Sequence, residues 1–71
     1  MIIYLQNRKR VERVPDRMWI TRNGDIYSIV SSAKMNPCMG NYENEERAIE
    51  VLREMFQYIR SGKKTYIMPA K

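Results

Sequence analysis

The chain has 71 residues, of which 44% are hydrophobic and 30% are charged, and its formal net charge is +5. This length allows one domain, residues 1–71, and the mixed composition excludes a low-complexity or disordered chain. No stretch approaches the roughly 20 apolar residues of a membrane span, and the apolar start at residues 1–5 is too short for an export signal. We therefore expect a cytoplasmic protein without a membrane partner.

The chain contains one cysteine, Cys38, and no histidine. An intrachain disulfide is excluded, and a zinc site would lack the thiolates and imidazoles that it normally uses. Because no histidine can activate Cys38, we expect a buried or half-buried apolar role for it rather than nucleophilic catalysis. Domains of this size commonly gain support from disulfides, metals or self-association, and the first two are scarce here. We therefore expect a homodimer.

Residues 1–14 read as two strands around a basic turn. The apolar residues of MIIYLQ and VERV predict the strands. Pro15 closes the second strand because proline cannot donate a hydrogen bond to a central ladder. The turn between the strands carries Arg8, Lys9 and Arg10.

A β-hairpin is predicted in residues 18–30, MWITRNGDIYSIV, where apolar and polar residues alternate around Asn23-Gly24. Asn-Gly is the strongest short hairpin signal, and a two-residue loop there would pair Arg22 with Asp25 near the turn. The same register predicts the pairs Ile20–Tyr27 and Met18–Ile29. The less apolar face of this hairpin is expected to carry Arg17, Trp19, Thr21, Ile26, Ser28 and Val30.

The clearest element is a helix from about Glu45 to Ser61. Placing residues at 100° steps gathers six apolar side chains in one arc: Ala48, Ile49, Leu52, Met55, Phe56 and Ile59. Asn44 is a good N-cap, and Gly62 can take the left-handed conformation that ends a helix.

The segments on either side of the helix are predicted to be short. Residues 33–37 read as a loop, residues 38–39 as a return strand and residues 40–41 as the turn into the helix. Residues 65–68 read as a final strand that Pro69 ends.

The predicted fold class is α+β. A small antiparallel sheet of four to five strands in residues 1–42 packs on one amphipathic helix at residues 44–62, and a short closing strand lies at residues 65–69.

Val51 and Tyr58 widen the apolar face of the helix to about half of its circumference. Two interpretations are open. The sheet can curl around the helix and bury this flank, or Val51, Met55 and Tyr58 can meet their mates in a two-fold dimer interface.

We expect no enzymatic activity, no cofactor and no metal. The sequence has no Gly-rich phosphate loop and no cluster typical of acid–base catalysis. Glu46, Glu50 and Glu54 recur at i, i+4 spacing, which suits a divalent cation. Because they share the polar arc of the helix with Arg47 and Arg53, a solvated helix face is favoured over a metal site.

Positive charge is concentrated in the strand region. Residues 1–41 hold seven basic and three acidic residues, whereas residues 42–71 hold six and five. A basic surface is the footprint expected of phosphate contact, and aromatic rings such as Trp19 or Tyr4 beside it can stack on bases. The candidate nucleic-acid-binding residues are Arg8, Lys9, Arg10, Arg13, Arg17, Trp19 and Arg22. Alternatively, Trp19 is a core anchor and the basic turn only keeps a sheet edge soluble.

The C-terminal half, GNYENEERAIEVLREMFQYI followed by TYIMP, resembles a group of short uncharacterised proteins of phages, prophages and mobile elements of Firmicutes. The matching positions are Gly40, Tyr42, Glu45, Glu46, Arg47, Ala48, Val51, Leu52, Glu54, Met55, Tyr66, Met68 and Pro69. This resemblance implies an accessory protein of a mobile element, such as an inhibitor of a host defence system. The order of strands and helix is also similar to the PC4-like single-stranded DNA-binding architecture, from which the closing strand departs.

These patterns predict a non-enzymatic accessory protein that binds nucleic acid or a nucleoprotein complex through its basic turn region. The resemblance implies a possible host defence protein as a partner, in the form of a CRISPR-type nuclease that the protein inhibits. The alternative is a protein–protein interaction module that contacts an acidic protein surface without nucleic acid.

Overall fold

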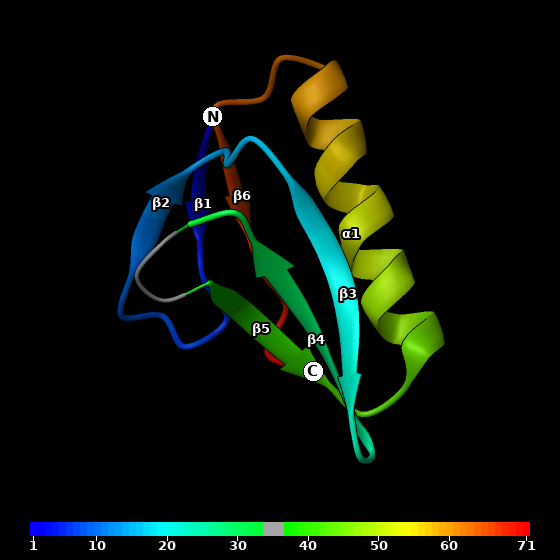
Figure 1. The fold of residues 1–71 in the computed structure, drawn as a ribbon. Helices are drawn as coiled ribbons and strands as arrows, with labels where there is room; N and C mark the ends of the chain where they lie inside the picture. The colour runs from blue at the N-terminus through cyan, green and yellow to red at the C-terminus, as the bar shows by residue number, and fades with distance from the viewer. Residues whose placement is uncertain (34–36) are drawn as a thin grey trace.

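The computed structural model describes residues 1–33 and 37–71 (Figure 1). Within these residues, six strands and one helix follow one another in this order: β1 (Ile2–Tyr4), β2 (Val11–Arg13), β3 (Met18–Asn23), β4 (Ile26–Ser31), β5 (Cys38–Tyr42), α1 (Glu45–Arg60) and β6 (Thr65–Ile67). The predicted α+β class, the helix and the closing strand after it are confirmed. Most of the loop predicted at 33–37 lies outside the described residues.

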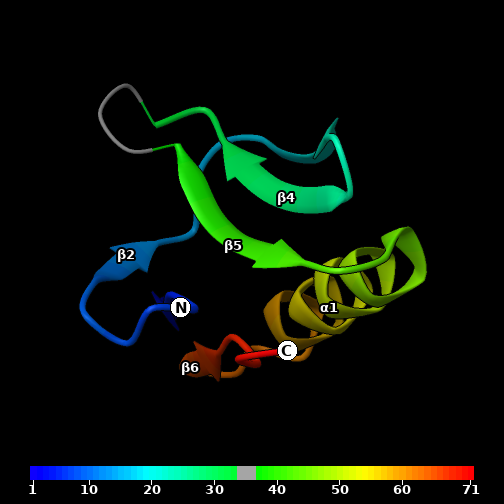
Figure 2. The ribbon, with the colours of Figure 1, turned by 90° about the horizontal axis from the view of Figure 1, so that it is seen from below.

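The strands form two sheets instead of the single antiparallel sheet that the sequence predicts. One sheet has the order β2–β1–β6 and the other has the order β3–β4–β5. β1 pairs antiparallel with β2 but parallel with β6, because the rest of the chain, including α1, forms the crossover that a parallel pair requires. The helix and the β2–β1–β6 sheet lie on the same side of the β3–β4–β5 sheet (Figure 2).

The β3–β4 hairpin forms, but the predicted register is wrong. Its two-residue loop is Gly24-Asp25, so Arg22 pairs with Tyr27 instead of Asp25. Gly24 has φ +64° while Asn23 stays in the strand, which is the arrangement of a hairpin loop with glycine in its first position. Because every partner shifts by two residues, the predicted membership of the two hairpin faces is retained. The other predicted pairs are replaced by Ile20–Ile29 and Met18–Ser31.

Helix α1 begins at the predicted residue and ends one residue earlier than predicted. The Asn44 side chain accepts a hydrogen bond of 2.8 Å from the backbone N–H of Arg47 and so caps the first turn. At the other end Gly62 has φ +71°, and the N–H of Lys63 donates to the Tyr58 carbonyl at 3.1 Å. This is the Schellman arrangement of a helix C-terminus.

β5 extends through Gly40 and Asn41, which the sequence predicts as a turn, and the turn lies at residues 43–44 instead. Gly40 favours a close approach here, because a Cβ at this position would lie 2.9 Å from the Met68 Cε and the end of that side chain would have to shift. The C-terminal segment can therefore pass close against β5.

Gln6 closes the free edge of β5. Its backbone N–H donates to the Met39 carbonyl at 3.3 Å. Its side-chain Oε1 accepts from the Asn41 N–H at 2.6 Å, and its Nε2 donates to the Asn41 carbonyl at 2.7 Å. The same Nε2 donates to the Ala70 carbonyl at 2.9 Å. Gln6 thus takes the place of a residue in a neighbouring strand.

The core lies between the two sheets and the helix. Its buried apolar residues are Ile3, Leu5, Ile29, Met39, Tyr42, Ala48, Val51, Met55, Tyr66 and Met68. The predicted dimer interface through Val51, Met55 and Tyr58 is wrong, because the structure engages these side chains within the chain. Val51 and Met55 are 1% and 0% exposed, and the ring of Tyr58 packs edge-to-face on Tyr66 with centroids 4.9 Å apart. The flank of the helix that carries Val51 and Tyr58 is covered within the chain, as the alternative interpretation of a curled sheet expects. The second sheet, β2–β1–β6, helps to cover it.

Candidate binding surfaces

The basic turn between β1 and β2 is held by its own backbone. Arg8 has φ +62°, which is uncommon for a residue with a side chain. Its N–H donates to the Leu5 carbonyl, and the Leu5 N–H donates to the Arg10 carbonyl, both at 3.0 Å. The Asn7 Oδ1 accepts from the Lys9 N–H at 2.8 Å. The turn is therefore a defined structure that holds three basic residues.

Two of these three basic side chains make contacts within the chain. Arg8 Nη1 donates to the carbonyl of Met68 and ties the turn to the C-terminal segment. Arg10 forms an ion pair with Glu12 of β2. The Lys9 side chain is exposed. Part of the charge that the sequence assigns to a binding site therefore stabilises the fold.

The fold separates the predicted nucleic-acid-binding residues into three places (Figure 1). The first is the basic turn. The second is the opposite end of the β2–β1–β6 sheet and the start of β3, which carry Arg13, Arg17 and Trp19. The third is the hairpin end of β3, where the Arg22 guanidinium carbon lies 5.8 Å from the centroid of the Tyr27 ring. The predicted set is therefore not one surface.

Trp19 is 45% exposed, so the interpretation of this residue as a core anchor is wrong. It lines an open hollow of about 550 Å³ between the start of β3 and the last turns of α1. This hollow, here called the β3 hollow, is lined by Val14, Pro15, Asp16, Arg17, Met18, Trp19, Phe56 and Ile59.

A second basic cluster lies at the C-terminal end of the helix, and we call it the basic end. It consists of exposed residues from three parts of the chain: Arg13, Arg17, Arg60, Lys63 and Lys64. A further open hollow of about 510 Å³ lies here, lined in part by the two lysines. It shares Val14 and Ile59 with the β3 hollow, so the two hollows adjoin.

Sequence reasoning missed Arg60, Lys63 and Lys64 as members of one cluster with Arg13. They lie about 50 positions further along the chain, and the near balance of charge in residues 42–71 conceals them. The signal that points to them is the separation of charge within that half, since its acidic residues all lie at positions 43–54.

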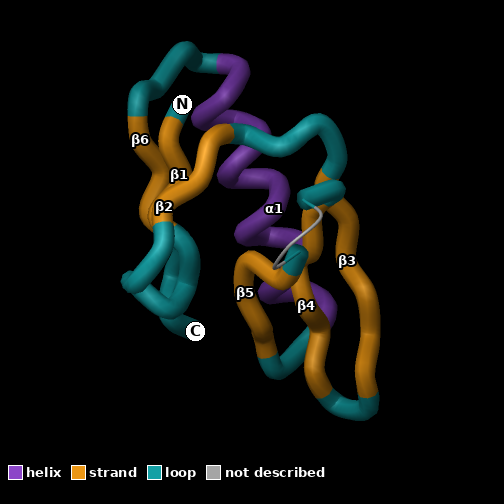
Figure 3. The backbone as a smooth tube through the Cα atoms, turned by 60° about the vertical axis from the view of Figure 1, so that its left-hand side comes forward, coloured by secondary structure: helices purple, strands orange, loops and turns teal. Residues whose placement is uncertain are grey.

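The outer face of the β2–β1–β6 sheet carries an apolar surface, here called the apolar sheet face. Val11, Tyr4 and Ile67 are direct cross-strand neighbours in one row, and Ile2 lies in the next row beside Arg13. The exposed fractions are 47% for Ile2, 42% for Tyr4, 52% for Val11 and 57% for Ile67. The three strands lie side by side, apart from the β3–β4–β5 sheet (Figure 3).

The inner face of the same sheet fills the core. Ile3 and Tyr66 alternate with the exposed residues and are 0% and 2% exposed. A strand with one solvated face normally alternates apolar and polar residues, whereas the sequence of β1, Ile-Ile-Tyr, is apolar on both faces. This lack of alternation is the sequence signal that could have identified the apolar sheet face.

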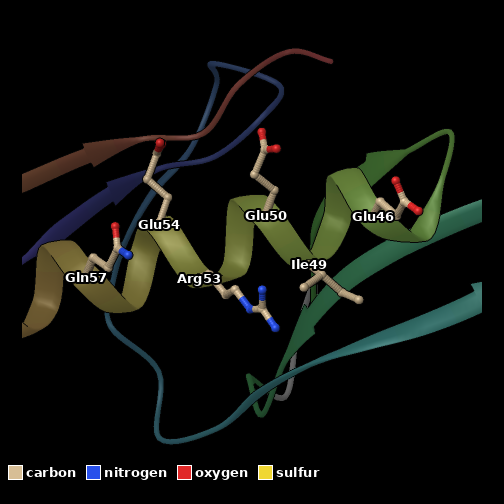
Figure 4. Close-up of a pocket in the computed structure, with 6 residues that line it drawn as sticks. All are labelled: Glu46, Ile49, Glu50, Arg53, Glu54 and Gln57. Carbon is tan, nitrogen blue, oxygen red and sulfur yellow. The ribbon is translucent and has the colours of Figure 1, made fainter.

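Three glutamates of α1, Glu46, Glu50 and Glu54, line an open hollow of about 490 Å³ on the solvent side of the helix (Figure 4). Glu50 forms an ion pair with Arg47, and Glu54 accepts a hydrogen bond of 2.9 Å from the Tyr66 hydroxyl. Within residues 1–33 and 37–71, no group of three or more His, Cys, Asp or Glu is arranged to hold a metal.

Cys38 is exposed, which corrects the expectation of a buried or half-buried thiol. Its Sγ lies 3.5 Å from the Asn41 Oδ1, which in turn accepts a hydrogen bond of 2.6 Å from the Ser28 hydroxyl. These three side chains lie on the face of the β3–β4–β5 sheet that is turned away from the helix.

Two buried tyrosines have shifted pKa values. Burial raises the pKa of Tyr42 to about 12, against the opposing effect of the positive charges of Arg47 and Arg8. Burial also raises the pKa of Tyr66, and the hydrogen bond to Glu54 acts in the same direction. The Tyr42 hydroxyl donates to a backbone carbonyl at 2.9 Å. Both phenols are therefore protonated structural donors at neutral pH.

Comparisons of the chain with known protein families, with curated proteins and with solved structures found no match. In the part of the chain that the structure describes, no helix has the length and apolar character needed to cross a membrane.

Proposed function

We propose that the protein is a non-enzymatic binding module that contacts an acidic surface of a partner protein through its apolar sheet face. The observation that carries this proposal is the gathering of exposed apolar side chains. Among the described residues, four of the seven large apolar side chains that are exposed share this one face. Single apolar residues on a surface need no explanation, whereas a contiguous patch is typical of an interaction site.

The charges around the apolar sheet face favour an acidic partner. Arg13 lies in the same cross-strand row as Ile2, and Lys64 directly precedes the residue that pairs with Ile2 on the other side. Glu12 alternates onto the inner face, where it pairs with Arg10. Because complementary charge at the rim of an interface steers association and selects the partner, we expect carboxylates around the partner's apolar residues.

The composition of the apolar sheet face favours protein over nucleic acid. Bases stack on flat rings, and Tyr4 is the one aromatic residue among its four members. The three aliphatic side chains suit the apolar centre of a protein interface. The contacts of Arg8 and Arg10 within the chain also weaken the case for the basic turn as a phosphate-binding site.

The proposal is tested with a matched pair of variants. Ile67→Glu places a negative charge on the apolar sheet face, and Ile26→Glu places the same charge at the β3–β4 hairpin, where the side chain is 41% exposed. Affinity capture from nuclease-treated lysate, quantified by mass spectrometry, should recover a protein with the wild type and with Ile26→Glu but not with Ile67→Glu. Equal capture by the two variants would contradict the proposal. Circular dichroism checks that both variants are folded.

Nucleic-acid binding is a second candidate function, and the basic end is the observation that favours it. Arg17 and Trp19 line the β3 hollow, and Lys63 and Lys64 line the hollow that adjoins it. An aromatic ring beside several cations is the combination that binds single strands. We therefore place this function at the basic end and no longer at the basic turn.

Salt dependence separates this candidate from the first. Affinity for a single-stranded oligonucleotide should fall steeply with salt, and Lys63→Ala with Lys64→Ala should reduce the slope by about two. Lys9→Ala is the control and should leave the slope nearly unchanged. Absence of binding at low salt excludes nucleic acid as the ligand.

We propose a phage or mobile-element setting on the strength of the resemblance alone. In this setting the bound partner is a host defence nuclease of the CRISPR type, held as a protein or as its nucleoprotein complex. Adding the purified protein to a cleavage reaction of such a nuclease tests the setting, with Ile67→Glu as the matched variant. Unchanged cleavage when the nuclease is saturated with the purified protein would exclude this setting.

A further inference from the structure

β3 is an open edge of the β3–β4–β5 sheet. It pairs with β4 along all six of its residues without a register shift, and its sequence has no proline or lysine. Natural edge strands are usually short, bulged, charged or covered, because an open edge is a template for another strand. β2 and β6 have three residues each, and Gln6 covers β5. β3 is longer and unbulged, and within the described residues Arg22 near its hairpin end is the one charged residue of the strand.

The hydrogen-bond pattern identifies the backbone groups at this edge. The Ser32 N–H donates to the Arg17 carbonyl at 3.0 Å, so these two residues form a hydrogen-bonded pair that continues the β3–β4 ladder. Hydrogen-bonded and non-hydrogen-bonded pairs alternate in an antiparallel ladder. The N–H and carbonyl groups of Met18, Ile20 and Arg22 therefore point away from β4. They offer three donors and three acceptors to an added strand.

The helix leaves an apolar flank beside this edge. α1 packs on β4, β5 and β6, and Phe56 remains 44% exposed although it belongs to the apolar arc of the helix. Phe56 and Ile59 form one wall of the β3 hollow, and Met18 of β3 forms the other. Side chains of an added strand that lie opposite Met18 and Ile20 would share their face of the sheet and point toward this flank.

We propose that an extended segment of a partner protein adds to β3 as a fourth strand, with an apolar side chain in the β3 hollow. Its backbone pairs with Met18, Ile20 and Arg22, and the inserted side chain packs on Phe56 and Ile59. This mode of recognition takes affinity from main-chain hydrogen bonds and specificity from a pocket for alternate side chains.

The charges at the hollow select an acidic segment. Arg17 lines the β3 hollow, and Arg60 lies one helical turn beyond Phe56 on the same ridge of α1. Asp16 is the one acidic residue in the wall of the hollow. Carboxylates that alternate with apolar residues in the segment would meet this positive border. The site is separate from the apolar sheet face, so either proposal can fail without the other.

The test uses a synthetic octapeptide of alternating valine and glutamate as the probe. Two further forms carry N-methyl groups, one on all valines and one on all glutamates. Because alternate residues of a strand turn their N–H groups to opposite edges, one methylated form should lose about tenfold or more in affinity and the other should bind like the parent. A valine–lysine octapeptide should bind more weakly than the parent. Equal binding by both methylated forms, or no binding of the parent at millimolar concentration, overturns the proposal.

Protein variants and amide exchange locate the bound peptide. Ile20→Pro removes one N–H that points away from β4, and Phe56→Asp places a charge in the hollow, so both should weaken binding about tenfold or more. Ile26→Asp, at the end of the β3–β4 hairpin where the side chain is 41% exposed, is the control and should bind normally. The bound peptide should slow exchange of the Met18 and Ile20 amides. If these amides are already protected in the free protein, and more so at higher protein concentration, a second copy occupies the edge and the partner segment is ruled out.

Discussion

The Tyr66 hydroxyl donates a hydrogen bond of 2.9 Å to the Glu54 carboxylate and so joins the closing strand to the outer side of the helix. Tyr66→Phe should lower the free energy of unfolding by about 1 kcal/mol, since the change removes the donor hydroxyl and its hydrogen bond, while the Glu54 carboxylate can turn to water. Urea unfolding measures this difference. Glu46→Gln, on the same side of the helix, is the control and should change stability by less than about 0.5 kcal/mol.

Stability should fall as the pH rises above about 10. Burial raises the pKa of Tyr42 to about 12 from its ordinary value of 10.0, so the unfolded chain loses this proton at a lower pH than the folded chain. The contribution of Tyr42 to the free energy of unfolding is complete below pH 10 and is lost between pH 10 and 12. Over this range the free energy of unfolding should fall by at most about 1.4 kcal/mol per pH unit.

Replacement of the phenol isolates this effect from the titration of lysines. Tyr42→Phe should have a shallower decline of unfolding free energy between pH 10 and 11 than the wild type, although its stability at pH 7 is lower. Parallel curves for the two proteins would show that Tyr42 does not titrate differently in the folded chain.

Gly40→Ala should destabilise the protein by about 1–3 kcal/mol, because the new methyl group would lie 2.9 Å from the Met68 Cε and 3.2 Å from the Gln6 Cβ. Met68→Ala in the same chain removes the first of these atoms. The double variant should therefore lose less than the sum of the two single changes, and additive losses would argue against this contact.

Arg8→Gly should be more stable than Arg8→Ala by about 1 kcal/mol. Both variants lose the hydrogen bond to the Met68 carbonyl, but glycine adopts φ +62° without the cost that an alanine side chain brings. Thermal unfolding of the two variants gives the difference directly. Equal stability would mean that the turn changes conformation when the arginine is removed.

Met55→Ala should cost about 2–5 kcal/mol and Phe56→Ala about 1 kcal/mol or less, although both residues belong to the predicted apolar arc. Met55 is fully buried and Phe56 is 44% exposed. Urea unfolding of the two variants compares these costs. Similar costs for both would mean that Phe56 is covered in solution, and sedimentation would then show whether a second copy covers it.

The local elements could be predicted from the sequence because local rules determine them. The helix has a cap at Asn44, a terminator at Gly62 and a repeat of 3.6 residues between them, and all three signals agree. For the hairpin, the sequence predicts correctly which residues share a face, although the register it predicts is wrong. The Asn-Gly signal places a glycine in the loop but does not determine which neighbour shares the loop with it, and a shift by two residues leaves the faces unchanged.

The arrangement of these elements could not be predicted in the same way. The apolar half of the helix offers two flanks, and periodicity does not say which one a sheet covers. Tyr58 is half-buried against Tyr66 because β6 joins β1, a pairing between positions more than 60 residues apart. The basic end has the same origin in part: Arg13 lies beside Ile2 through the pairing of β1 with β2, but Lys64 comes next to Ile2 only through the pairing of β1 with β6.

Closure of the β5 edge by Gln6 sets the number of strands that the β3–β4–β5 sheet can accept. Two open edges would allow each molecule to bind one neighbour on either side, and such head-to-tail contacts propagate into fibres. With the backbone of Asn41 already engaged by Gln6, growth is confined to β3. This sheet can therefore take one added strand, at β3, and a complex formed in that way would have a fixed stoichiometry.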